Sequence, residues 1–397
     1  MKTSQYDIVV IGAGPGGSTA ARYAAEGGAK VLMLERDREA GIPVRCAEGV
    51  SHNGIVPFIE INQKWIAAKI NVACLHSPDG DNAYMHNNGV GYVLERRIFD
   101  TELCNLAIRA GVKMLTKADA IGLEFTDNKI SGVRYRHNNE IKNANCSIVI
   151  GADGIESRVG RWAGMETSLA LNDIDTCVQY TVSGVEFASD TCHFYFGKRV
   201  APGGYVWIFP KGKGVANIGI GISGDLAKDK GPKEYLDEFM EQNYPEAQAN
   251  YTVYGGVSTT WGLKEYIKDN IMLVGDAARQ VNPMTGGGIV QAMIAGRYAG
   301  KVAAEAILSG DCSKKSLMKY KKDWDSKLGN LQKTMYSIKE KFMKMDDEKF
   351  NKLVQVCKKI PPNEFSLRKL FTEAMKGDPL LMAEIAKALV VSKMKLK

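Results

Sequence analysis

A glycine-rich turn near the N-terminus constrains this chain more than any other feature of its sequence. Residues 7–11 are a β-branched apolar run, which is typical of a buried parallel strand. The turn at 12–17 (G-A-G-P-G-G) follows at once, then small helix-forming residues, and then a second apolar run, 30–34, that ends at Glu35. Strand, G-x-G-x-x-G turn, helix, strand and acid in this order predict a Rossmann-like α/β domain with a parallel sheet.

Each residue of this turn has a distinct expected task. Gly12 permits the tight turn, Gly14 lets the backbone of the turn, with Ala13, approach a pyrophosphate, and Gly17 allows close helix–strand packing. The N-terminus of the following helix offers free N–H groups to phosphate. Glu35 is placed to accept hydrogen bonds from a ribose diol. These residues predict dinucleotide binding, but they do not distinguish FAD from NAD.

Two later segments favour FAD. Residues 147–154 are a strand running into a Gly-Ala-Asp-Gly turn, and residues 270–278 are a strand that ends in Gly-Asp. The second strand delivers Asp276 to a loop, where it can bind a ribityl hydroxyl. The glycine-rich turn before the next helix, at Gly288 and Ile289, suits the electron-rich pyrimidine edge of a reduced flavin. With these three motifs in order, the sequence resembles the FAD-dependent p-hydroxybenzoate hydroxylase-like superfamily.

Three further segments narrow the resemblance. Residues 43–50 contain R-C-A-E-G, residues 202–221 contain Y-V-W-I-F-P followed by G-I-G, and residues 92–100 contain an arginine-bearing helix start. These segments resemble elements of the geranylgeranyl reductase family, and the resemblance extends over the whole chain. Ala47 departs from the pattern, since glycine is expected there, and its methyl group should slightly alter how the loop approaches the flavin.

The resemblance implies roles for individual residues. It places the loop with Arg45, Cys46, Ala47 and Gly49 close to the isoalloxazine ring, and Arg96 against the FAD. Ala120 is expected on a strand whose backbone reads the adenine. Gly219 and Gly221 form the G-x-G element of the substrate region.

Three aromatic residues alternate along one predicted strand. Tyr205, Trp207 and Phe209 have a period of two, so they lie on one face of the strand. This face either walls a cavity for an isoprenoid chain or belongs to an ordinary core. The framing prolines and the resemblance favour the cavity wall.

The expected reaction is the saturation of isoprenoid C=C bonds in geranylgeranyl chains of membrane-lipid precursors. Reduced FAD gives a hydride from N5 to one alkene carbon, and Cys46, or a water that it holds, is the candidate donor of the proton. One alternative is an FAD-dependent monooxygenase or halogenase on the same fold. Another is a lipid-binding or flavin-carrying protein without catalysis. The electron donor is unidentified: no second G-x-G-x-x-G unit is present, so NADPH binds transiently or a ferredoxin-type protein docks.

The expected domains are interleaved along the chain. Residues 1–60, 95–165 and 266–310 are assigned to the FAD domain, and residues 61–94 and 166–265 to a mostly antiparallel substrate domain with strands at 176–182, 193–196, 205–209 and 215–221. Residues 311–397 are expected to form amphipathic helices. The apolar stretch 380–391 is either an interfacial helix or a helix packed on the protein.

Composition excludes several other classes of protein. With 397 residues, 45% of them hydrophobic and 24% charged, the chain is neither disordered nor fibrous. The 8 cysteines form no C-x-x-C pair, so reduced thiols are expected rather than disulfides or a zinc site. The 5 histidines show no metal-ligand spacing, so no metal is expected, and no G-x-S-x-G motif suggests a serine hydrolase.

Charge and hydropathy bear on location. No signal peptide and no membrane-spanning run are expected, which predicts a cytoplasmic protein. The net charge of +7 is concentrated in residues 313–397, with 21 Lys and Arg against 10 Asp and Glu, whereas the rest of the chain carries −4. This segment is either attracted to an anionic membrane surface or forms a solvated helical face. No nucleic-acid partner is expected.

Overall fold

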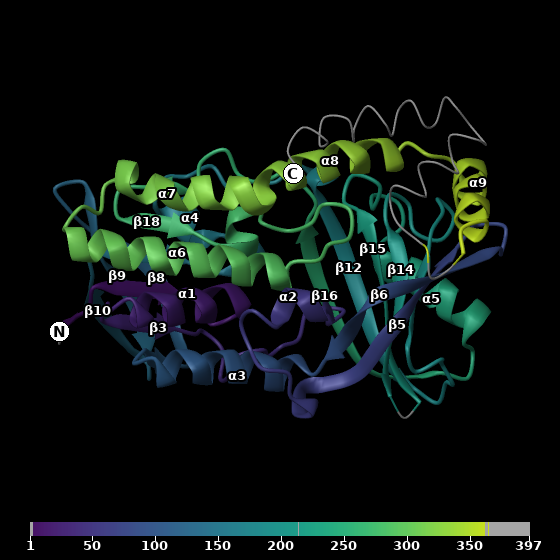
Figure 1. The fold of residues 1–397 in the computed structure, drawn as a ribbon, viewed down its shortest axis with the longest axis horizontal. Helices are drawn as coiled ribbons and strands as arrows, with labels where there is room; N and C mark the ends of the chain where they lie inside the picture. The colour runs from purple at the N-terminus through teal and green to yellow at the C-terminus, as the bar shows by residue number, and fades with distance from the viewer. Residues whose placement is uncertain (1–2, 213, 362–363, 365–397) are drawn as a thin grey trace. The chain divides into compact units, whose positions relative to one another are not determined.

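The computed structural model describes residues 3–212, 214–361 and 364, without the side chains of 3, 4 and 87–89 (Figure 1). Contacts divide the chain into two compact units. The first unit comprises the described residues up to 44 together with 96–168 and 260–333. The second unit comprises 45–95, 169–259 and the described residues from 334 onward.

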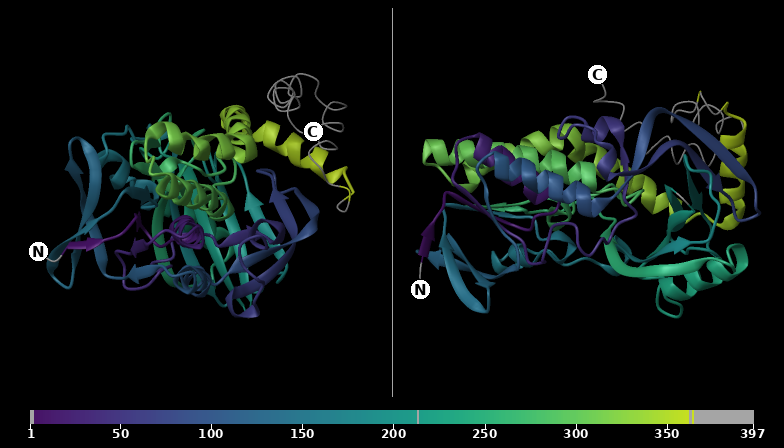
Figure 2. Two further views of the ribbon diagram at one scale, coloured as in Figure 1. Left: turned by 60° about the vertical axis from the view of Figure 1, so that its left-hand side comes forward. Right: turned by 90° about the horizontal axis from the view of Figure 1, so that it is seen from below.

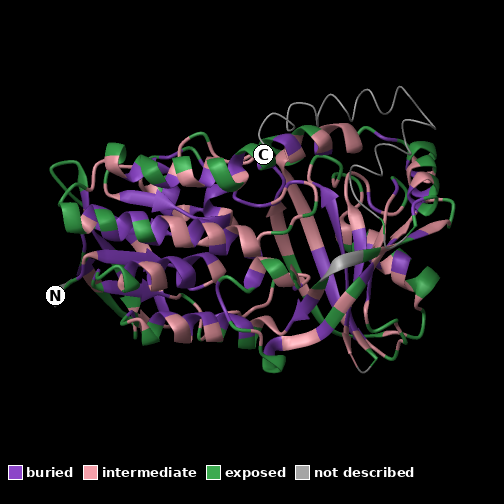
Figure 3. Ribbon diagram, in the orientation of Figure 1, coloured by how far each residue is buried: buried purple, intermediate pink, exposed green. Residues whose placement is uncertain are grey.

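The first unit is built on a six-stranded sheet. Its order is β17 (Ile267–Lys268), β18 (Ile271–Leu273), β11 (Ile148–Gly151), β2 (Ile8–Ile11), β3 (Val31–Leu34) and β7 (Lys113–Leu115). All neighbours are parallel except β17 and β18. The strands β2, β3 and β11 are buried along their whole length, because helices cover a parallel sheet (Figure 3).

Small residues bring two helices of this unit close together. A Cβ on Gly296 would lie 2.3 Å from the carbonyl oxygen of Gly16, so α6 (Ile289–Ser309) can pack directly on α1 (Pro15–Glu26). The two helices lie side by side in Figures 1 and 2. The other helical segments of this unit are α3 (Arg96–Arg109), η2 (Gly154–Glu156), α4 (Arg158–Trp162), η4 (Gly275–Ala278), α7 (Lys314–Trp324) and a π-helical turn (Asp325–Gly329).

A smaller sheet completes the first unit. Its order is β1 (Thr3–Gln5), β10 (Glu140–Asn145), β9 (Lys129–His137) and β8 (Ala118–Thr126). The amide of Ala118 donates to the carbonyl of Glu35, so the start of β8 is attached to the end of β3. The chain therefore brings β8 close to the acid that ends the first motif.

The second unit contains an eight-stranded sheet. Its order is β16 (Gln248–Ser258), β12 (Ile174–Ser183), β15 (Val215–Ser223), β14 (Tyr205–Gly212), β13 (Thr191–Tyr195), β5 (Ile66–His76), β6 (Asn82–Leu94) and β4 (Gly49–Ser51). Every pairing is antiparallel except that of β13 with β5. Val206 and Ile208 pack in a core with Leu236 and Phe239 of α5 (Pro232–Asn243), so α5 covers one face. The remaining segments are α2 (His52–Ile55), η1 (Gln63–Trp65), η3 (Leu171–Asp173), α8 (Asn330–Phe342), which begins in the first unit, and α9 (Asp347–Lys358).

The predicted fold class is confirmed, with a Rossmann-like sheet, a largely antiparallel sheet and C-terminal helices. The contact boundaries differ from the expected domain boundaries most at two places, with shorter differences at residues 95, 166–168 and 260–265. Residues 45–60 fall in the second unit because β4 pairs with β6, and residues 311–333 fall in the first unit because α7 packs on α6. The stretch 380–391 lies outside the described residues. Within the described chain, no helix is both long and apolar enough to span a bilayer.

Candidate active site

The glycine turn of the first unit joins β2 to α1, and its shape depends on missing side chains. Gly12 has a φ of +100°, which residues with a Cβ rarely adopt, and its amide donates to the carbonyl of Leu34 at 2.8 Å. A Cβ on Gly17 would lie 1.9 Å from the carbonyl oxygen of Gly12, so only glycine permits this packing. Apart from Gly14 and its two chain neighbours, no atom of the described residues lies within 4 Å of the position that a Cβ on Gly14 would take, which leaves this side of the turn accessible to a phosphate.

Glu35 is tied to the same turn. Its Oε2 accepts a hydrogen bond from the amide of Ala13 and its Oε1 from the amide of Asp37, both at 2.8 Å. Burial raises the pKa of Glu35, and these two amides oppose the shift. A carboxylate has about four acceptor positions, so Glu35 keeps the capacity to bind two ribose hydroxyls. The residues of this turn therefore fit the pyrophosphate and ribose of a dinucleotide.

The late motif places an acid beside a helix N-terminus. Asp276 lies in η4 and is half-buried, and its carboxylate accepts no hydrogen bond from any described residue. Burial raises the pKa of Asp276, and the cations of Arg279 and Arg96 oppose the shift. Gly288 precedes α6, whose first residue is Ile289, and a Cβ on Gly288 would lie 3.2 Å from Asp276 Oδ1. A half-buried acceptor without a protein donor fits a ribityl hydroxyl.

Two other predicted contacts of the cofactor also lie in the first unit. Arg96 begins α3, and its Nε and Nη2 donate to the two carboxylate oxygens of Asp100, each at 2.7 Å. This bidentate pair fixes the plane of the guanidinium. Ala120 is buried on β8, where its backbone pairs with Tyr135. Direct contact of Arg96 or Ala120 with a flavin stays a prediction.

Sequence reasoning missed Arg279, a buried cation that joins the middle and late motifs. Its Nη1 donates to the carbonyls of Ile155, at 2.6 Å, and of Asp276, at 3.1 Å, while its Nη2 donates to the carbonyl of Thr167. Burial lowers the pKa of Arg279. Because the carbonyls of Ile155 and Thr167 are backbone acceptors from distant segments, only the place of Arg279 three residues after the Gly-Asp motif signals its role.

In the second unit, the loop at 45–49 leads into β4. Arg45 and Gly49 are exposed, whereas Cys46 and Ala47 are half-buried. A Cβ on Gly49 would lie 2.7 Å from the ring of Phe209, so this glycine lets the loop meet the aromatic strand β14.

A chain of hydrogen bonds connects the loop to the aromatic strand. Trp207 Nε1 donates to Gln179 Oε1 at 2.9 Å, and Gln179 Nε2 donates to the carbonyl of Cys46 at 3.1 Å. The sulfur of Cys46 accepts from the amide of Glu48 at 3.2 Å. The backbone and sulfur of Cys46 are thus both held in place.

Glu48 is the anchor of this loop, and the predicted set of site residues did not include it. It is buried in the left-handed conformation, with a φ of +74°. Its Oε2 accepts from Lys211 Nζ at 2.6 Å and from Asn217 Nδ2 at 2.7 Å. The Lys211 ammonium also donates to the carbonyl of Leu94 and pairs with Glu95 at 3.1 Å. The Glu48 carboxylate is therefore engaged with Lys211 and Asn217, and it is the Glu48 amide that contacts the thiol.

The three alternating aromatic residues lie on the face of β14 opposite the α5 core. Tyr205 and Trp207 have ring centroids 5.9 Å apart, and Phe194 of β13 contacts both Tyr205 and Phe209 at 5.8 and 5.6 Å. A Cβ on Gly219 would lie 2.3 Å from the Trp207 ring. These contacts make one aromatic surface, whose role in holding substrate stays a prediction.

Gly221 lies on the same face and serves packing as well. It pairs with Tyr205 across β14 and β15, and a Cβ there would lie 3.2 Å from the sulfur of Cys177. Both glycines of the G-x-G element therefore make room for neighbouring side chains.

Comparison with known proteins decides the family. Residues 173–259 match the geranylgeranyl reductase catalytic domain, and residues 6–186 match the pyridine nucleotide-disulphide oxidoreductases. Digeranylgeranylglycerophospholipid reductase 1 of Methanococcoides burtonii is 45% identical over 382 residues, which cover 95% of this chain and 94% of the relative. This chain belongs to the geranylgeranyl reductase family. The predicted family is thereby confirmed.

Other members agree with this assignment. Digeranylgeranylglycerophospholipid reductase of Methanothrix thermoacetophila is 42% identical to this chain. The match covers 96% of this chain and 98% of that relative. The crystal structure of a geranylgeranyl bacteriochlorophyll reductase-like protein from Thermoplasma acidophilum matches with a TM-score of 0.93 at 38% identity, covering 98% of this chain and 100% of that chain.

A flavin-dependent brominase matches with a TM-score of 0.72 at 16% identity, covering 98% of this chain and 94% of that chain, which shows a shared fold alone.

Proposed function

We propose that this protein saturates C=C bonds in the geranylgeranyl chains of membrane-lipid precursors, with FAD as its redox cofactor. The observation that carries the proposal is the match, over nearly the full length of both chains, to digeranylgeranylglycerophospholipid reductases. Family membership also confirms the predictions of an FAD-dependent oxidoreductase. The similarity to halogenases, by contrast, extends to the fold alone.

The first unit supplies the residues that would hold FAD. The turn at Gly12, Gly14 and Gly17 offers backbone amides to the pyrophosphate, Glu35 accepts from the adenosine ribose, and Asp276 accepts from the ribityl chain. When bound and reduced, FAD supplies the hydride for alkene reduction. The protein's part is to orient the reactants and to keep water out.

The second unit supplies a surface suited to an isoprenoid. Such a chain offers only apolar groups and π bonds, so burial rather than hydrogen bonding must hold it, at about 0.8 kcal/mol per methylene-sized group. Tyr205, Trp207 and Phe209 provide a continuous aromatic face for this purpose. Binding without directional bonds also lets the chain shift so that successive alkenes can react.

Saturation requires a proton as well as a hydride, and Cys46 is the proposed donor. An isolated alkene has no carbonyl to take up negative charge, so protonation must lead or accompany hydride transfer. Gln179 holds the backbone of Cys46, and the Glu48 amide donates a hydrogen bond to its sulfur, which holds the thiol in place.

Asp175 is a further titratable group, near the start of β12 in the sheet that carries the aromatic face. Burial raises its pKa to about 6, while the Lys339 ammonium opposes the shift, so it exchanges protons near neutral pH. The charges of Cys177, Asp175 and Cys46 all raise the pKa of Tyr205, after burial as the main cause.

The electron donor is either NADPH or a ferredoxin-type protein, and the protein acts in the cytoplasm at the surface of the membrane that holds its substrate. A lipid substrate requires contact with that surface, and the basic segment 313–397 favours anionic headgroups. Anaerobic stopped-flow reduction of the bound FAD by NADPH and by reduced ferredoxin distinguishes the two donors. Co-sedimentation with anionic and with neutral vesicles tests whether the protein is attracted to anionic headgroups.

The reaction is tested by anaerobic incubation of dithionite-reduced protein with unsaturated archaeal-type lipids, followed by mass spectrometry. Each turnover should add two hydrogens to the lipid. Cys46→Ser should retain FAD and lose most of the activity, whereas Cys312→Ser, a change at another half-buried cysteine, should not. Addition of oxygen, or no change of mass with FAD bound and reduced, would overturn the proposal. Full turnover by Cys46→Ser would remove Cys46 from the mechanism alone.

A further inference from the structure

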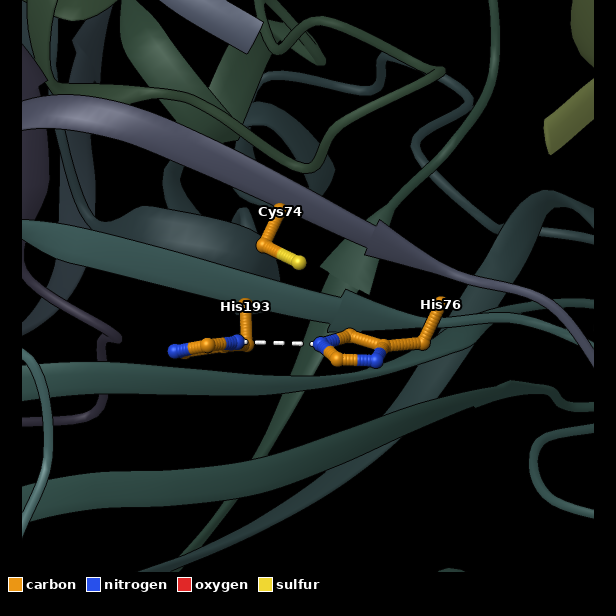
Figure 4. Close-up of side chains that lie close together, drawn as sticks. All are labelled: Cys74, His76 and His193. Carbon is orange, nitrogen blue, oxygen red and sulfur yellow. Dashed lines mark hydrogen bonds between the residues drawn. The ribbon is translucent and has the colours of Figure 1, made fainter. Parts of the chain in front are cut away.

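Two strands of the second unit bring a cysteine and two histidines together. Cys74 and His76 are two residues apart on β5, so they lie on the same face of the sheet. His193 lies directly opposite Cys74 in the parallel pairing of β13 with β5. Figure 4 shows the three side chains close together, with the sulfur of Cys74 near the two rings.

The distances between the three groups approach those of a metal site. His76 Nε2 and His193 Nδ1 are 2.9 Å apart, and one ligand atom from each of the three residues lies within 4.8 Å of the others. Tetrahedral Zn²⁺ with bonds of about 2.0 Å to nitrogen and 2.3 Å to sulfur needs nitrogens about 3.3 Å apart and sulfur about 3.6 Å from each. The ligand atoms would have to move by about 1 Å to reach this geometry.

We propose that Cys74, His76 and His193 bind one Zn²⁺ ion. A thiolate with two imidazoles is a donor set that zinc prefers, whereas magnesium and calcium prefer oxygen ligands. The fourth position falls to water.

The surroundings of the cluster support this assignment. The ring of His76 is stacked on Tyr195 with centroids 3.9 Å apart and planes at 4°, which fixes its orientation. Burial lowers the pKa of His76 to about 4 and also lowers that of His193, so both rings are in the neutral form that binds metals. Burial raises the pKa of Cys74 to about 11, so binding releases a proton.

A metal here would join segments that are far apart in the sequence. The pairing of β13 with β5 is the sole parallel pairing among the described strands of this sheet, and parallel pairs are slightly less stable than antiparallel ones. Histidine spacing along the chain does not reveal the cluster, because His193 is 117 residues from His76. The metal ties β5 to β13, which is next to the aromatic strand β14.

Cobalt titration of the full-length, metal-depleted protein tests the site. Co²⁺ substitutes for zinc and should bind with a stoichiometry of one, giving a thiolate-to-cobalt charge-transfer band that Zn²⁺ then removes. Zinc should raise the melting temperature by several degrees. The charge-transfer band should be lost in Cys74→Ser. In His76→Gln, the apparent affinity for Co²⁺ should fall at least tenfold.

The matched control is Cys192→Ser, because Cys192 is also buried and lies next to His193 but points to the other face of β13. Its band should equal that of the unchanged protein. Absence of the band in the unchanged protein, its survival in Cys74→Ser, or its equal loss in Cys192→Ser would overturn the proposal. If Cys74→Ser fails to fold, the test rests on the affinity of His76→Gln for Co²⁺. An affinity equal to that of the unchanged protein would reject the site.

Discussion

The anchor of the loop at 45–49 gives the sharpest prediction of stability. Glu48→Gln keeps the size of the side chain but removes the charge that faces Lys211 at 2.6 Å, where the side chains are 4% and 12% exposed. Removing one partner of a buried ion pair costs about 3–5 kcal/mol. Lys211 keeps Glu95 and the carbonyl of Leu94, and the amide oxygen of glutamine still accepts hydrogen bonds. The expected loss for Glu48→Gln is therefore about 2 kcal/mol.

The matched control is Glu95→Gln, since Glu95 contacts the same lysine but its side chain is 44% exposed. That change should cost less than about 0.5 kcal/mol. Guanidinium unfolding of the two variants with bound FAD gives the free energies. In a double-mutant cycle with Lys211→Met, Glu48→Gln should show a coupling of about 1–2 kcal/mol.

The same variant should also affect Cys46. Loss of the anchor frees the Glu48 amide from the sulfur of Cys46, so alkylation of this cysteine, followed by peptide mass mapping, should accelerate several-fold. If Glu48→Gln costs no more than Glu95→Gln, or if the alkylation rate of Cys46 is unchanged, the ion pair does not hold the loop and this reasoning fails.

Three further predictions concern separate parts of the chain. Burial raises the folded pKa of Asp175 from 3.8 to about 6, so the folded state keeps a proton that the unfolded chain releases, and stability falls as the pH rises through this window. Guanidinium unfolding at pH 8 should therefore show Asp175→Asn to be more stable than the unchanged protein by up to about 3 kcal/mol, and equal stabilities would contradict the shift. Gly17→Ala places a Cβ 1.9 Å from the Gly12 oxygen, so FAD affinity in a fluorescence titration should fall at least tenfold, and unchanged affinity would reject this role of the turn. Trp207→Ala should change which isoprenoid chain lengths react in a mass-spectrometric product assay. An unchanged chain-length preference would mean that Trp207 is a core residue and does not contact the substrate.

The nucleotide half of the fold was predictable because local sequence determines it. Glycine is required at positions 12 and 17 for local reasons. Gly12 adopts a positive φ, and Gly17 lies against the backbone of Gly12, five positions away. The strands around them are short apolar runs that predict burial without knowledge of their neighbours. The alternation of Tyr205, Trp207 and Phe209 likewise predicted a shared face, which the strand β14 confirms.

What sequence reasoning missed depends on contacts between distant segments. Arg279 donates to carbonyls of Ile155 and Thr167, and backbone acceptors leave no signature in the sequence. Glu48 lies in the quoted R-C-A-E-G segment, yet its partners Lys211 and Asn217 are about 165 positions away. Periodicity places residues on faces of their own strands, but it does not say which strands become neighbours.

The same limitation explains the relation between the loop and the aromatic face. Gln179 has no motif of its own, yet it receives a hydrogen bond from Trp207 and gives one to the carbonyl of Cys46. A change of indole position is therefore transmitted to the backbone of the proposed proton donor through a single side chain. Gln179→Leu should separate two expected functions. The chain-length preference expected of the Trp207 ring should persist, while kcat should fall because the carbonyl of Cys46 loses its donor. If kcat were unchanged with FAD fully bound, Cys46 would be positioned by its own loop alone.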